Sequence, residues 1–406
     1  MSSIFKCLFP FIIFSANFGY SNVQNYDLRL LQTILKGKRI DPDKKLEQFA
    51  ADISFVIFDL KYNVRDGIKI CETQPISLSK LSGYDYLMEE DGLVQGMLCD
   101  YISKFQCPVW YMEKTVCDPK LKIKFAERGW KNFENFNKLV ADDAFIKASS
   151  TRVNDPYNLN DYHGIVYVRP TQNISLVELR RKYPGVIVLD AALYSHIRDK
   201  HSMDFLLKSS PKLSTLRPVS KIYPKVFSKD LVESIFQDIK SDIFVIKPLN
   251  STKGFGVIII DKDNLESTLE YLFTKENKSK LLSNPDQTYN YWATDRERSF
   301  LVEQFIESDY LKAPQFDNKL YDCTMRVIAI LFYHQKKSEL DVLAGYWKLP
   351  IKSVSEEGTL IEKHKSYAKI PHFLKVDPEI IEKVKQQLQD GFQELYTNCN
   401  SNSNEG

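Results

Sequence analysis

The chain has 406 residues, of which 55 are basic and 53 acidic, giving a formal net charge of +2 at pH 7. This length allows a sizeable core divided among two or three lobes. The balanced charge argues against a general electrostatic surface for nucleic acid. The seven scattered cysteines contain no Cys-x-x-Cys pair, so the sequence predicts neither a zinc site nor a disulfide framework.

Residues 1–21 have the composition of an export signal. A basic start precedes about a dozen mostly apolar residues, and Gly19-Tyr20-Ser21 resembles a cleavage site. The apolar run is too short for a stable membrane span. Reduced cysteines favour a cytoplasmic protein, whereas cleavage here would make the chain an exported one, and both locations stay open. The polar residues 22–45 are expected to link this segment to the rest.

A hairpin with oxygen ligands is predicted next. The apolar run Ile53–Leu60 and the alternating run Ile68–Cys71 flank the turn signal Arg65-Asp66-Gly67. The second strand delivers Glu72 and Gln74 to one side, because positions two apart on a strand share a face. A carboxylate and a carbonyl oxygen suit magnesium, which takes few protein ligands and many phosphate oxygens.

The middle of the chain predicts a small αβ unit. Short apolar strands at Ile165–Val168 and Val186–Leu189 are separated by a helical piece at Ser175–Tyr183. A helical stretch over residues 190–207 leads into residues 211–224, which we expect to form a loop. A further helix is expected over residues 227–239.

Residues 242–261 predict a second hairpin with a lysine beside a glycine turn. Apolar strands at 243–246 and 257–260 are joined by a polar turn containing Gly254 and Gly256, and Lys247 lies where the first strand ends. Backbone N–H groups in such a turn can lie over an anion, which points to nucleotide phosphates. The order of residues differs from that of a P-loop, a dinucleotide fingerprint and a protein kinase. An ordinary hairpin whose glycines serve only the turn is the alternative.

The remaining elements are strands and one long helix. An apolar strand over 299–303 ends in Glu303, after a polar stretch at 276–298 that we expect to be a surface insertion. Two strands are expected over 322–332 and 340–349. Asp377-Pro378 begins a last helix with an apolar stripe, formed by Ile380, Val384, Leu388, Phe392 and Leu395. A polar tail follows.

The order of these motifs resembles the ATP-grasp superfamily. The Lys-Pro strand, the glycine hairpin, a helix and Leu-Val-Glu-x-Phe-Ile follow one another as they do in that family. The resemblance implies that phosphates are bound by Lys247 and by the hairpin residues Asn250, Ser251, Lys253, Gly254 and Gly256. It implies an adenine hinge and an adenine or ribose carboxylate, formed by Glu303, Gln304, Phe305, Ile306 and Glu307. It also implies a second phosphate lysine near a helix start, which is Lys200, with a solvated helix-end charge as the alternative.

The early position of the metal pair resembles the circularly permuted members of that superfamily. ATP-grasp enzymes normally carry a Glu-x-Asn pair near the end of the domain, whereas eukaryotic-type glutathione synthetases and glutathionylspermidine synthetases carry it earlier. Residues 70–79 resemble their metal segment. Asp59 occupies the preceding strand, where glutathionylspermidine synthetases keep an aspartate ligand. The resemblance covers roughly residues 53 to 370.

Three departures change what the resemblance implies. Gln74 stands in place of asparagine and lengthens the arm of the metal ligand. Leu249-Asn250-Ser251 follows Lys-Pro where the glutathione enzymes have an acidic ligand, so Asp322 and Glu303 become the candidates to close the metal site. Residues 362–367 replace the glycine-rich lid, so γ-glutamylcysteine is not the expected substrate.

Two basic residues on the later strands are implied to act in catalysis. ATP-grasp ligases place an arginine at the start of the first of these strands to bind the acyl phosphate, and Arg326 occupies that place. Its charged planar fork suits the task, and a structural ion pair is the alternative. A basic residue that holds the substrate carboxylate is implied at Lys348, with a surface strand lysine as the alternative.

The sequence thus predicts an α/β (α+β) protein with an ATP-grasp fold, in which a nucleotide lies between two α+β lobes. The expected divisions are an apolar N-terminus (1–21), an N-terminal lobe with the metal-binding hairpin (22–165), a small αβ unit (166–240), a nucleotide-binding region (241–398) and a tail (399–406).

The expected function is an ATP-dependent ligase that joins a carboxylate to an amine or thiol through an acyl phosphate, with ATP and Mg²⁺ as cofactors. Its partners would be a small-molecule or peptide carboxylate and an amine or thiol acceptor. The alternatives are a catalytically inert nucleotide-binding or interaction protein, and an ATP-dependent phosphotransferase on the same scaffold.

Overall fold

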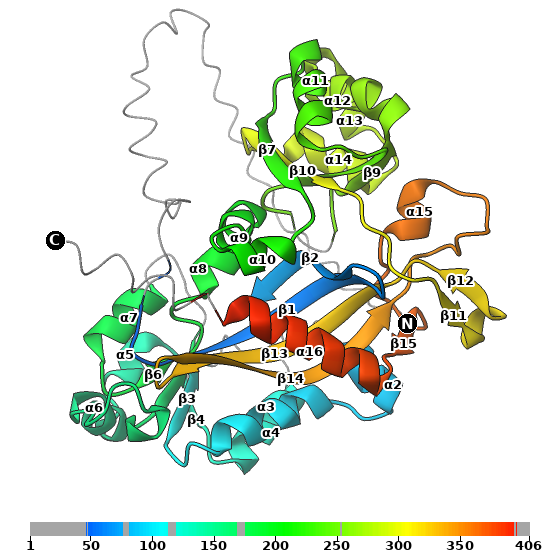
Figure 1. Cartoon of the computed structure of the whole chain (residues 1–406). Coiled ribbons are helices and arrows are strands. Elements are labelled where there is room, and N and C mark those ends of the chain that lie inside the picture. Colours follow the sequence, from blue (N-terminus) through cyan, green and yellow to red (C-terminus); the bar gives the residue numbers. More distant parts are fainter. Residues whose placement is uncertain are drawn as a thin grey trace, which may run out of the picture. The chain divides into compact units, whose positions relative to one another are not determined.

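The computed structural model describes residues 46, 48–75, 81–112, 119–168, 175–251, 254–393 and 395 (Figure 1). Contacts divide the chain between Pro42 and Asp43, and every described residue belongs to the second unit. The predictions for residues 1–21, for the polar residues 22–45 and for the tail fall outside the described residues, as does Lys253. No described helix has the length and apolar character needed to cross a membrane.

A five-stranded antiparallel sheet, which we call the central sheet, has the order β15-β14-β13-β1-β2. Its strands are β1 (Asp52–Asn63), β2 (Gly67–Pro75), β13 (Thr324–His334), β14 (Lys337–Lys348) and β15 (Phe373–Lys375). The first predicted hairpin is therefore confirmed. Its strand β1 pairs with β13, so that Asp59 lies opposite Arg326, a residue 267 positions later in the chain.

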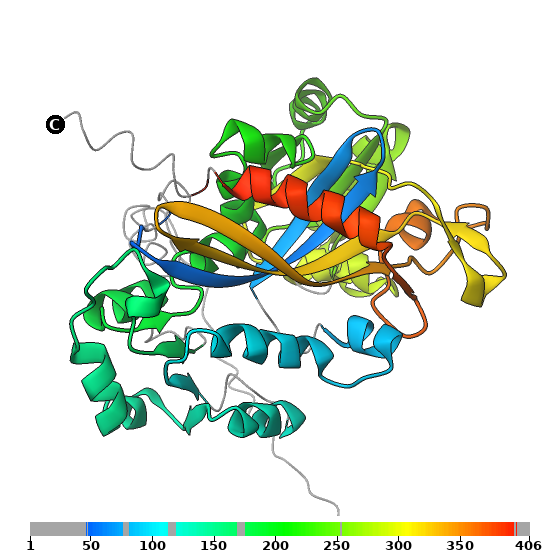
Figure 2. The same ribbon diagram turned by 60° about the horizontal axis from the view of Figure 1, so that its bottom comes forward.

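Both faces of the central sheet are covered. On one face, Val56, Phe58 and Leu60 pack against α16 (Pro378–Phe392), and the ring of Phe58 lies 5.3 Å from that of Phe392. This confirms the apolar stripe predicted for the last helix. On the other face, Phe55 and Ile57 pack against α2 (Ser82–Met88) and α3 (Leu93–Ser103). Figure 2 shows α16 and α3 on opposite sides of the sheet.

A parallel sheet with the order β4-β3-β5-β6 packs against the same core as α3. It comprises β3 (Val109–Met112), β4 (Lys131–Phe133), β5 (Ile165–Tyr167) and β6 (Ile187–Val188), with α4 (Pro119–Glu127), α5 (Phe136–Leu139), α6 (Asp143–Ser150) and α7 (Leu176–Lys182). The predicted boundary at residue 165 falls at the first residue of β5. Together these layers confirm the mixed α/β class.

A third sheet, the small sheet, is antiparallel with the order β7-β10-β8-β9. Its elements are β7 (Ser220–Pro224), β8 (Ile243–Pro248), β9 (Ile258–Asp261) and β10 (Ser299–Gln304), with α11 (Lys229–Asp238), α12 (Leu265–Phe273), α13 (Lys278–Leu282) and α14 (Gln287–Thr294). The second predicted hairpin is β8-β9, and its first strand ends at Lys247-Pro248 as expected.

Two predictions about the neighbouring segments were wrong. Residues 211–224 are not a loop, because Ser210 caps α10 (Pro211–Thr215) and residues 220–224 form β7. Residues 276–298 are not a surface insertion, because α13 and α14 bury Leu281 and Trp292 in the core of the small sheet. The indole N–H of Trp292 also donates to the carbonyl of Gly256 at 2.9 Å.

Short elements connect these layers. The predicted helix over residues 190–207 is divided into α8 (Tyr194–Ile197) and α9 (Lys200–Leu207), because the Asp199 carboxylate caps α9 by accepting from the N–H of Ser202. The others are β11 (Leu311–Ala313), β12 (Lys319–Tyr321), α15 (Leu360–His364) and the 3-10 turns Leu159–Asp161, Lys262–Asn264, Lys275–Asn277 and Pro314–Phe316.

Candidate functional site

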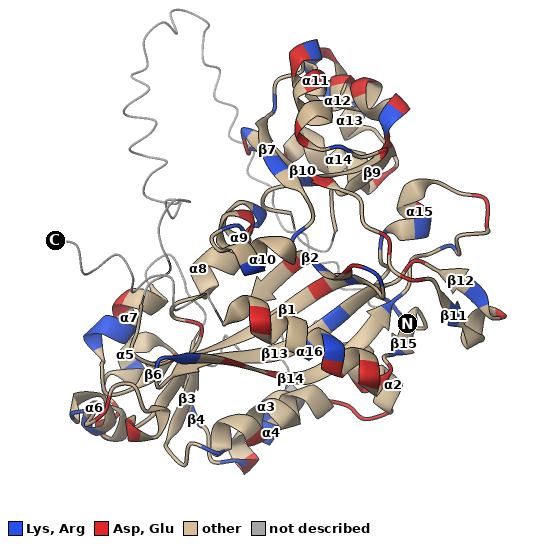
Figure 3. Ribbon diagram, in the orientation of Figure 1, with Lys and Arg blue, Asp and Glu red and all other residues tan. Residues whose placement is uncertain are grey.

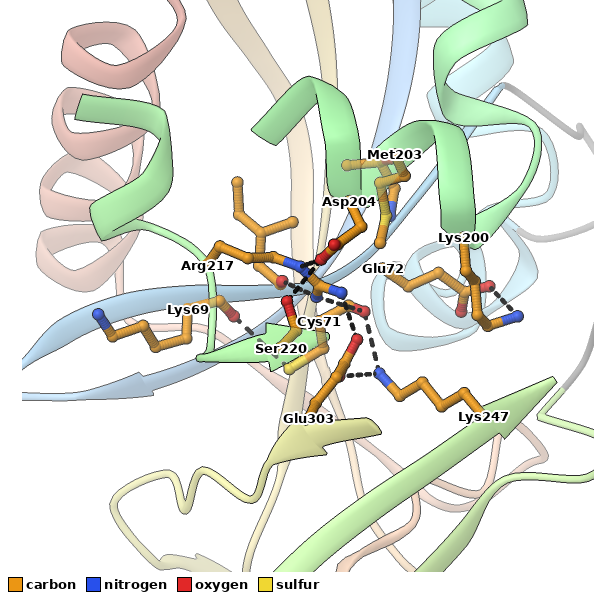
Figure 4. Close-up of polar contacts among 12 residues, drawn as sticks. Lys69, Cys71, Glu72, Lys200, Met203, Asp204, Arg217, Ser220, Lys247 and Glu303 are labelled. Atoms are coloured by element: carbon orange, nitrogen blue, oxygen red, sulfur yellow. Dashed lines mark hydrogen bonds and ion pairs between the residues drawn. The ribbon is translucent and has the colours of Figure 1, made fainter. Parts of the chain in front are cut away.

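A buried ionic cluster lies where β2, α9 and the small sheet meet (Figure 4). Lys247 at the end of β8 and Glu303 on β10 share one face of the small sheet, because Lys247 pairs with Leu301, two residues before Glu303. The Lys247 ammonium donates to a Glu303 oxygen and, at 3.1 Å, to the carbonyl of Cys71 on β2. The lysine predicted to bind phosphates is therefore held between the small sheet and the strand that carries Glu72.

Arg217, which sequence reasoning missed, lies at the centre of this cluster. Its guanidinium donates to Glu303 and, at 3.2 Å, to Asp204 of α9. It also donates to the carbonyls of Ile70 and Cys71 at 2.9 and 3.3 Å. Burial lowers the pKa of Arg217, but Glu303 and Asp204 outweigh this and raise it. No local pattern in the sequence marks a single arginine between two short elements as part of a site.

Lys200 and Glu72 form the second part of the cluster. Lys200 is the first residue of α9, and its ammonium lies 3.9 Å from a Glu72 carboxylate oxygen. It donates to the carbonyl of Ser251 at 2.7 Å and to its hydroxyl at 3.1 Å. Burial lowers the pKa of Lys200, and Glu72 partly opposes this. Lys200 is thus buried against the glycine hairpin, which is not the solvated helix-end charge considered as its alternative.

A third ionic group lies on the central sheet, directly beside Glu72. Asp59 pairs with Glu72 across β1 and β2 and with Arg326 across β1 and β13, so these three residues share one face. Figure 3 shows basic and acidic positions together on these central strands. The Arg326 guanidinium donates to both Asp59 oxygens at 2.8 and 2.7 Å, and the Lys348 ammonium lies 2.8 Å from one of them. The structural ion pair, the alternative interpretation of Arg326, is the arrangement found here.

Burial and neighbouring charges shift the pKa values of Asp59 and Lys348 in this third group. Burial raises the pKa of Asp59, but Arg326 and Lys348 outweigh it and hold the carboxyl ionised, well below its usual range. Burial and the nearby Arg326 lower the pKa of Lys348 to about 8, although Asp59 and Glu72 oppose them. A lysine with a pKa shifted toward neutrality, beside other perturbed groups, is typical of a functional site.

Asp322 belongs to a different ion group from that of Glu72. One of its oxygens contacts the Lys61 ammonium at 2.7 Å and the His364 ring nitrogen Nδ1 at 2.8 Å, and the other accepts from the N–H of Ser308. Burial raises the pKa of Asp322, but Lys61 and His364 outweigh this and lower it. The ring of His364 packs edge-on against Phe305 of the predicted hinge, with centroids 4.9 Å apart.

The other predicted nucleotide contacts line the hinge and the hairpin. Gln304, Phe305 and Ile306 are half-buried, whereas Glu307 is exposed and accepts from the Tyr310 hydroxyl at 2.9 Å. Asn250 donates to Glu297. Gly254 and Gly256 both have positive φ, at 71° and 72°, a backbone conformation that favours glycine. Among the hydrogen bonds of the described residues, the side chains of these residues make none with the Lys247 ammonium.

The predicted metal ligands fit a divalent cation only in part. Within the described ranges, no three His, Cys, Asp or Glu side chains are grouped so as to hold a metal ion. Asp59 and Asp322 are both engaged by protein cations. Glu72 is different, because its side chain is 27% exposed and its ion pair with Lys200 is long. Gln74, on the same face of β2, is buried. Magnesium often needs only one or two protein carboxylates plus phosphate oxygens, so Glu72 fits that role.

Two surface clefts lie elsewhere. One, of about 590 Å³, is lined by residues 85–87 and 89–91. The other, of about 610 Å³, is lined by residues that include Tyr86, Leu311, Trp347 and Pro371. Neither includes a residue of the ionic cluster. We place the candidate site at the cluster, because buried cations and carboxylates from separate elements converge there, whereas the charged residues that line the first cleft are all acidic.

No family model matches the chain, and a search of curated proteins finds no match. Among solved structures, the chain is similar to a provisionally assigned gamma-glutamylcysteine synthetase from Methylobacillus flagellatus KT, with 8% identity, a TM-score of 0.40, and coverage of 86% of this chain and 90% of that one. It is also similar to the D-alanine-D-alanine ligases of Coxiella burnetii and Helicobacter pylori, with 9% and 13% identity and TM-scores of 0.30 and 0.29.

Both D-alanine-D-alanine ligases match over 57% of this chain, and the chain covers 51% and 58% of their own lengths. Likeness at this level assigns neither substrates nor site residues. The proposed function therefore depends on the residues and contacts of this chain.

Proposed function

We propose that the chain is an ATP-dependent ligase that joins a carboxylate to an amine or thiol. The observation that carries this proposal is the convergence of Lys200, Lys247 and Glu72, from three separate elements, beside the glycine hairpin. Two buried ammonium groups with a nearby, partly exposed carboxylate suit a polyphosphate and its metal ion. The convergence also supports the circularly permuted arrangement, because Glu72 comes from an early strand and Lys247 from a later one.

In this proposal the nucleotide phosphates lie between Lys200 and Lys247, under the hairpin that contains Gly254 and Gly256. The hinge at Glu303–Ile306 would contact adenine. Glu303 is already bound to Lys247 and Arg217, so its carboxylate would orient the phosphate lysine. The exposed Glu307 is the better candidate to contact ribose or adenine directly.

Magnesium, when bound, would neutralise charge on the phosphates, and Glu72 with Gln74 would hold it. Asp59 and Asp322 are not included in this set, because removing them from Arg326, Lys348 and Lys61 would leave buried cations unpaired.

The chemistry requires two displacements. A substrate carboxylate oxygen attacks the γ-phosphorus of ATP, the bond to the bridging oxygen breaks, and ADP leaves. The amine or thiol then attacks the acyl carbon, the carbon–oxygen bond to phosphate breaks, and the nucleophile releases its proton to solvent. Arg326 is proposed to stabilise the acyl phosphate and Lys348 to hold the substrate carboxylate. Both would have to turn from Asp59 toward the substrate.

One observation favours the alternative of nucleotide binding without turnover. Arg326 and Lys348 are buried and share a single carboxylate, so in this conformation neither reaches into an open site. Phosphate release that depends on an added carboxylate and amine would identify the ligase. Formation of ADP without free phosphate would identify a phosphotransferase, and binding without turnover the inert protein.

Nucleotide binding itself can be tested by thermal melting with magnesium and ATP. At a ligand concentration a hundredfold above Kd, the wild type should gain about 2.7 kcal/mol, and Lys247→Ala should lose most of this gain. Lys225→Ala is a matched control, because Lys225 is also a largely buried, paired lysine of the small sheet region. Lys225 follows Pro224, the residue of β7 that pairs with Ser299, whereas Glu303 pairs with Ser220 at the other end of β7. Absence of any shift in the wild type would refute the proposed function.

A further inference from the structure

Arg217 is the most highly connected side chain of the candidate site. Only 1% of its side chain is exposed, and its guanidinium contacts two carboxylates and two backbone carbonyls. A guanidinium has five N–H donors in a fixed planar fork, which a lysine ammonium cannot reproduce. Such a geometry fixes the relative positions of the groups that it contacts.

Those groups belong to three elements of the proposed nucleotide site, α9, β10 and β2. Asp204 is on α9, the helix that begins with Lys200. Glu303 is on β10, and its second oxygen binds Lys247. The carbonyls of Ile70 and Cys71 are on β2, immediately before Glu72. Lys247 also donates to the Cys71 carbonyl, so Arg217 and Lys247 share both Glu303 and this carbonyl.

Backbone contacts reinforce this connection. The N–H of Ile70 donates to the carbonyl of Leu216 at 2.6 Å, directly beside Arg217. The N–H of Thr73 donates to the Met203 sulfur of α9 at 3.0 Å. The end of β2 is therefore attached to the Arg217 segment on one side and to α9 on the other.

We propose that Arg217 is the positioning residue of the nucleotide site. It fixes the position of the Lys247 ammonium through Glu303, and it fixes the position of β2, which carries Glu72, through the carbonyls of Ile70 and Cys71. This inference rests on the proposed function. Without Arg217, Lys247 is the one ion-pair partner that Glu303 keeps among the described residues, and Glu303 then draws the Lys247 ammonium away from a phosphate. Two carbonyls of β2, those of Ile70 and Cys71, also lose the donor that they share, so the position of Glu72 relative to Lys200 is no longer fixed.

The test compares Arg217→Lys with Arg180→Lys. Arg180 is a matched control, because it is also buried and its guanidinium donates to two carbonyls, those of Pro184 and Val186, in the parallel-sheet region. ADP affinity is measured by calorimetry, and amide hydrogen exchange is measured at Ile70 and Thr73. Arg217→Lys should weaken ADP binding by at least about tenfold, as expected when a hydrogen bond to a charged group is lost. It should also accelerate exchange at both amides, whereas Arg180→Lys should do neither.

A second variant separates positioning from folding. In Arg217→Ala, guanidinium chloride at a non-denaturing concentration should restore part of the ADP affinity by entering the vacated space, and it should have no such effect on Arg180→Ala. Wild-type ADP affinity in Arg217→Lys with unchanged exchange at Ile70 and Thr73 would overturn the proposal, as would equal losses in both lysine variants. If the wild type binds no ADP, the proposed function fails, and the exchange rates alone decide whether Arg217 positions β2.

Discussion

Asp59 and Arg326 form a buried pair whose energy can be separated from any catalytic role. Asp59→Asn leaves the buried Arg326 and Lys348 without their carboxylate and should destabilise the fold by about 3–5 kcal/mol. Arg326→Ala leaves Asp59 with Lys348 as a partner and should cost less. The double variant should be more stable than the sum of the two losses by about 0.5–3 kcal/mol, because the two side chains contact each other. Denaturant unfolding of the four proteins measures this coupling.

The surface pair of Arg128 and Asp100 is the control for this comparison of single and double variants. It has the same chemistry and a 2.8 Å contact, but its side chains are 28% and 66% exposed, so its coupling should be about 0–1 kcal/mol. Equal coupling at the two sites would contradict a tightly engaged Asp59 and would leave it available as a metal ligand.

Single residues could be predicted from the sequence where a local pattern marks their chemistry. Lys247 was found because Lys-Pro precedes a glycine turn, and Glu72 because it ends an alternating strand. The partners of Asp59 could not be found in this way, because Arg326 and Lys348 reach it only after β1 pairs with β13. Arg217 lacks any local signal, since its four acceptors come from three elements far apart in the chain.

The glycine hairpin gives a prediction about a whole element. Alanine at Gly254 or Gly256 would adopt a positive φ and should cost on the order of 1–3 kcal/mol. Gly256→Ala should cost more, because its Cβ would lie 2.4 Å from the Pro248 ring and 2.9 Å from the Tyr291 ring. At Gly254 the nearest atom is the Cε of Lys365 at 3.0 Å, the end of a flexible side chain that can move. Unfolding measurements that show equal losses would contradict this description of the turn.

Helices and strands with a strong periodic sequence pattern were predicted well. Those that form because of pairing or packing with other elements of the small sheet were not. The two hairpins and the last helix follow from alternation, turn residues and an apolar stripe. By contrast, β7 has prolines beside and within it, which read as a loop, yet it forms an edge strand of the small sheet, where proline is tolerated. Helices α13 and α14 are mostly polar in sequence, and only Leu281 and Trp292 are fully buried among their apolar residues.

At the scale of the whole molecule, Asp190 joins the central sheet to the parallel sheet. It follows β6 at a φ of 63°, and its carboxyl oxygen accepts from the N–H of Phe55 on β1 at 2.6 Å. Its own N–H donates to the carbonyl of Ile53 at 2.9 Å. An apolar strand pattern indicates which face is buried but not which strand or turn it meets, so this connection was not predictable.

Asp190 should make the stability of the fold depend on pH. Burial, with Asp52 nearby, raises the pKa of Asp190 from 3.8 to about 7, although the Phe55 N–H opposes the shift. Between these values the folded chain keeps a proton that the unfolded chain releases, so the stability that Asp190 contributes is present in full below about pH 4 and is lost as pH rises toward 7.

The variant Asp190→Asn provides the comparison, because its side chain stays neutral at every pH and asparagine tolerates a positive φ. The free energy of unfolding of the wild type should therefore fall relative to the variant between pH 5 and 7, by up to about 1.4 kcal/mol per pH unit, and level off above pH 8. Denaturant unfolding across this range measures the difference, and a constant offset between the two proteins would show that the Asp190 carboxyl is ionised in the folded chain.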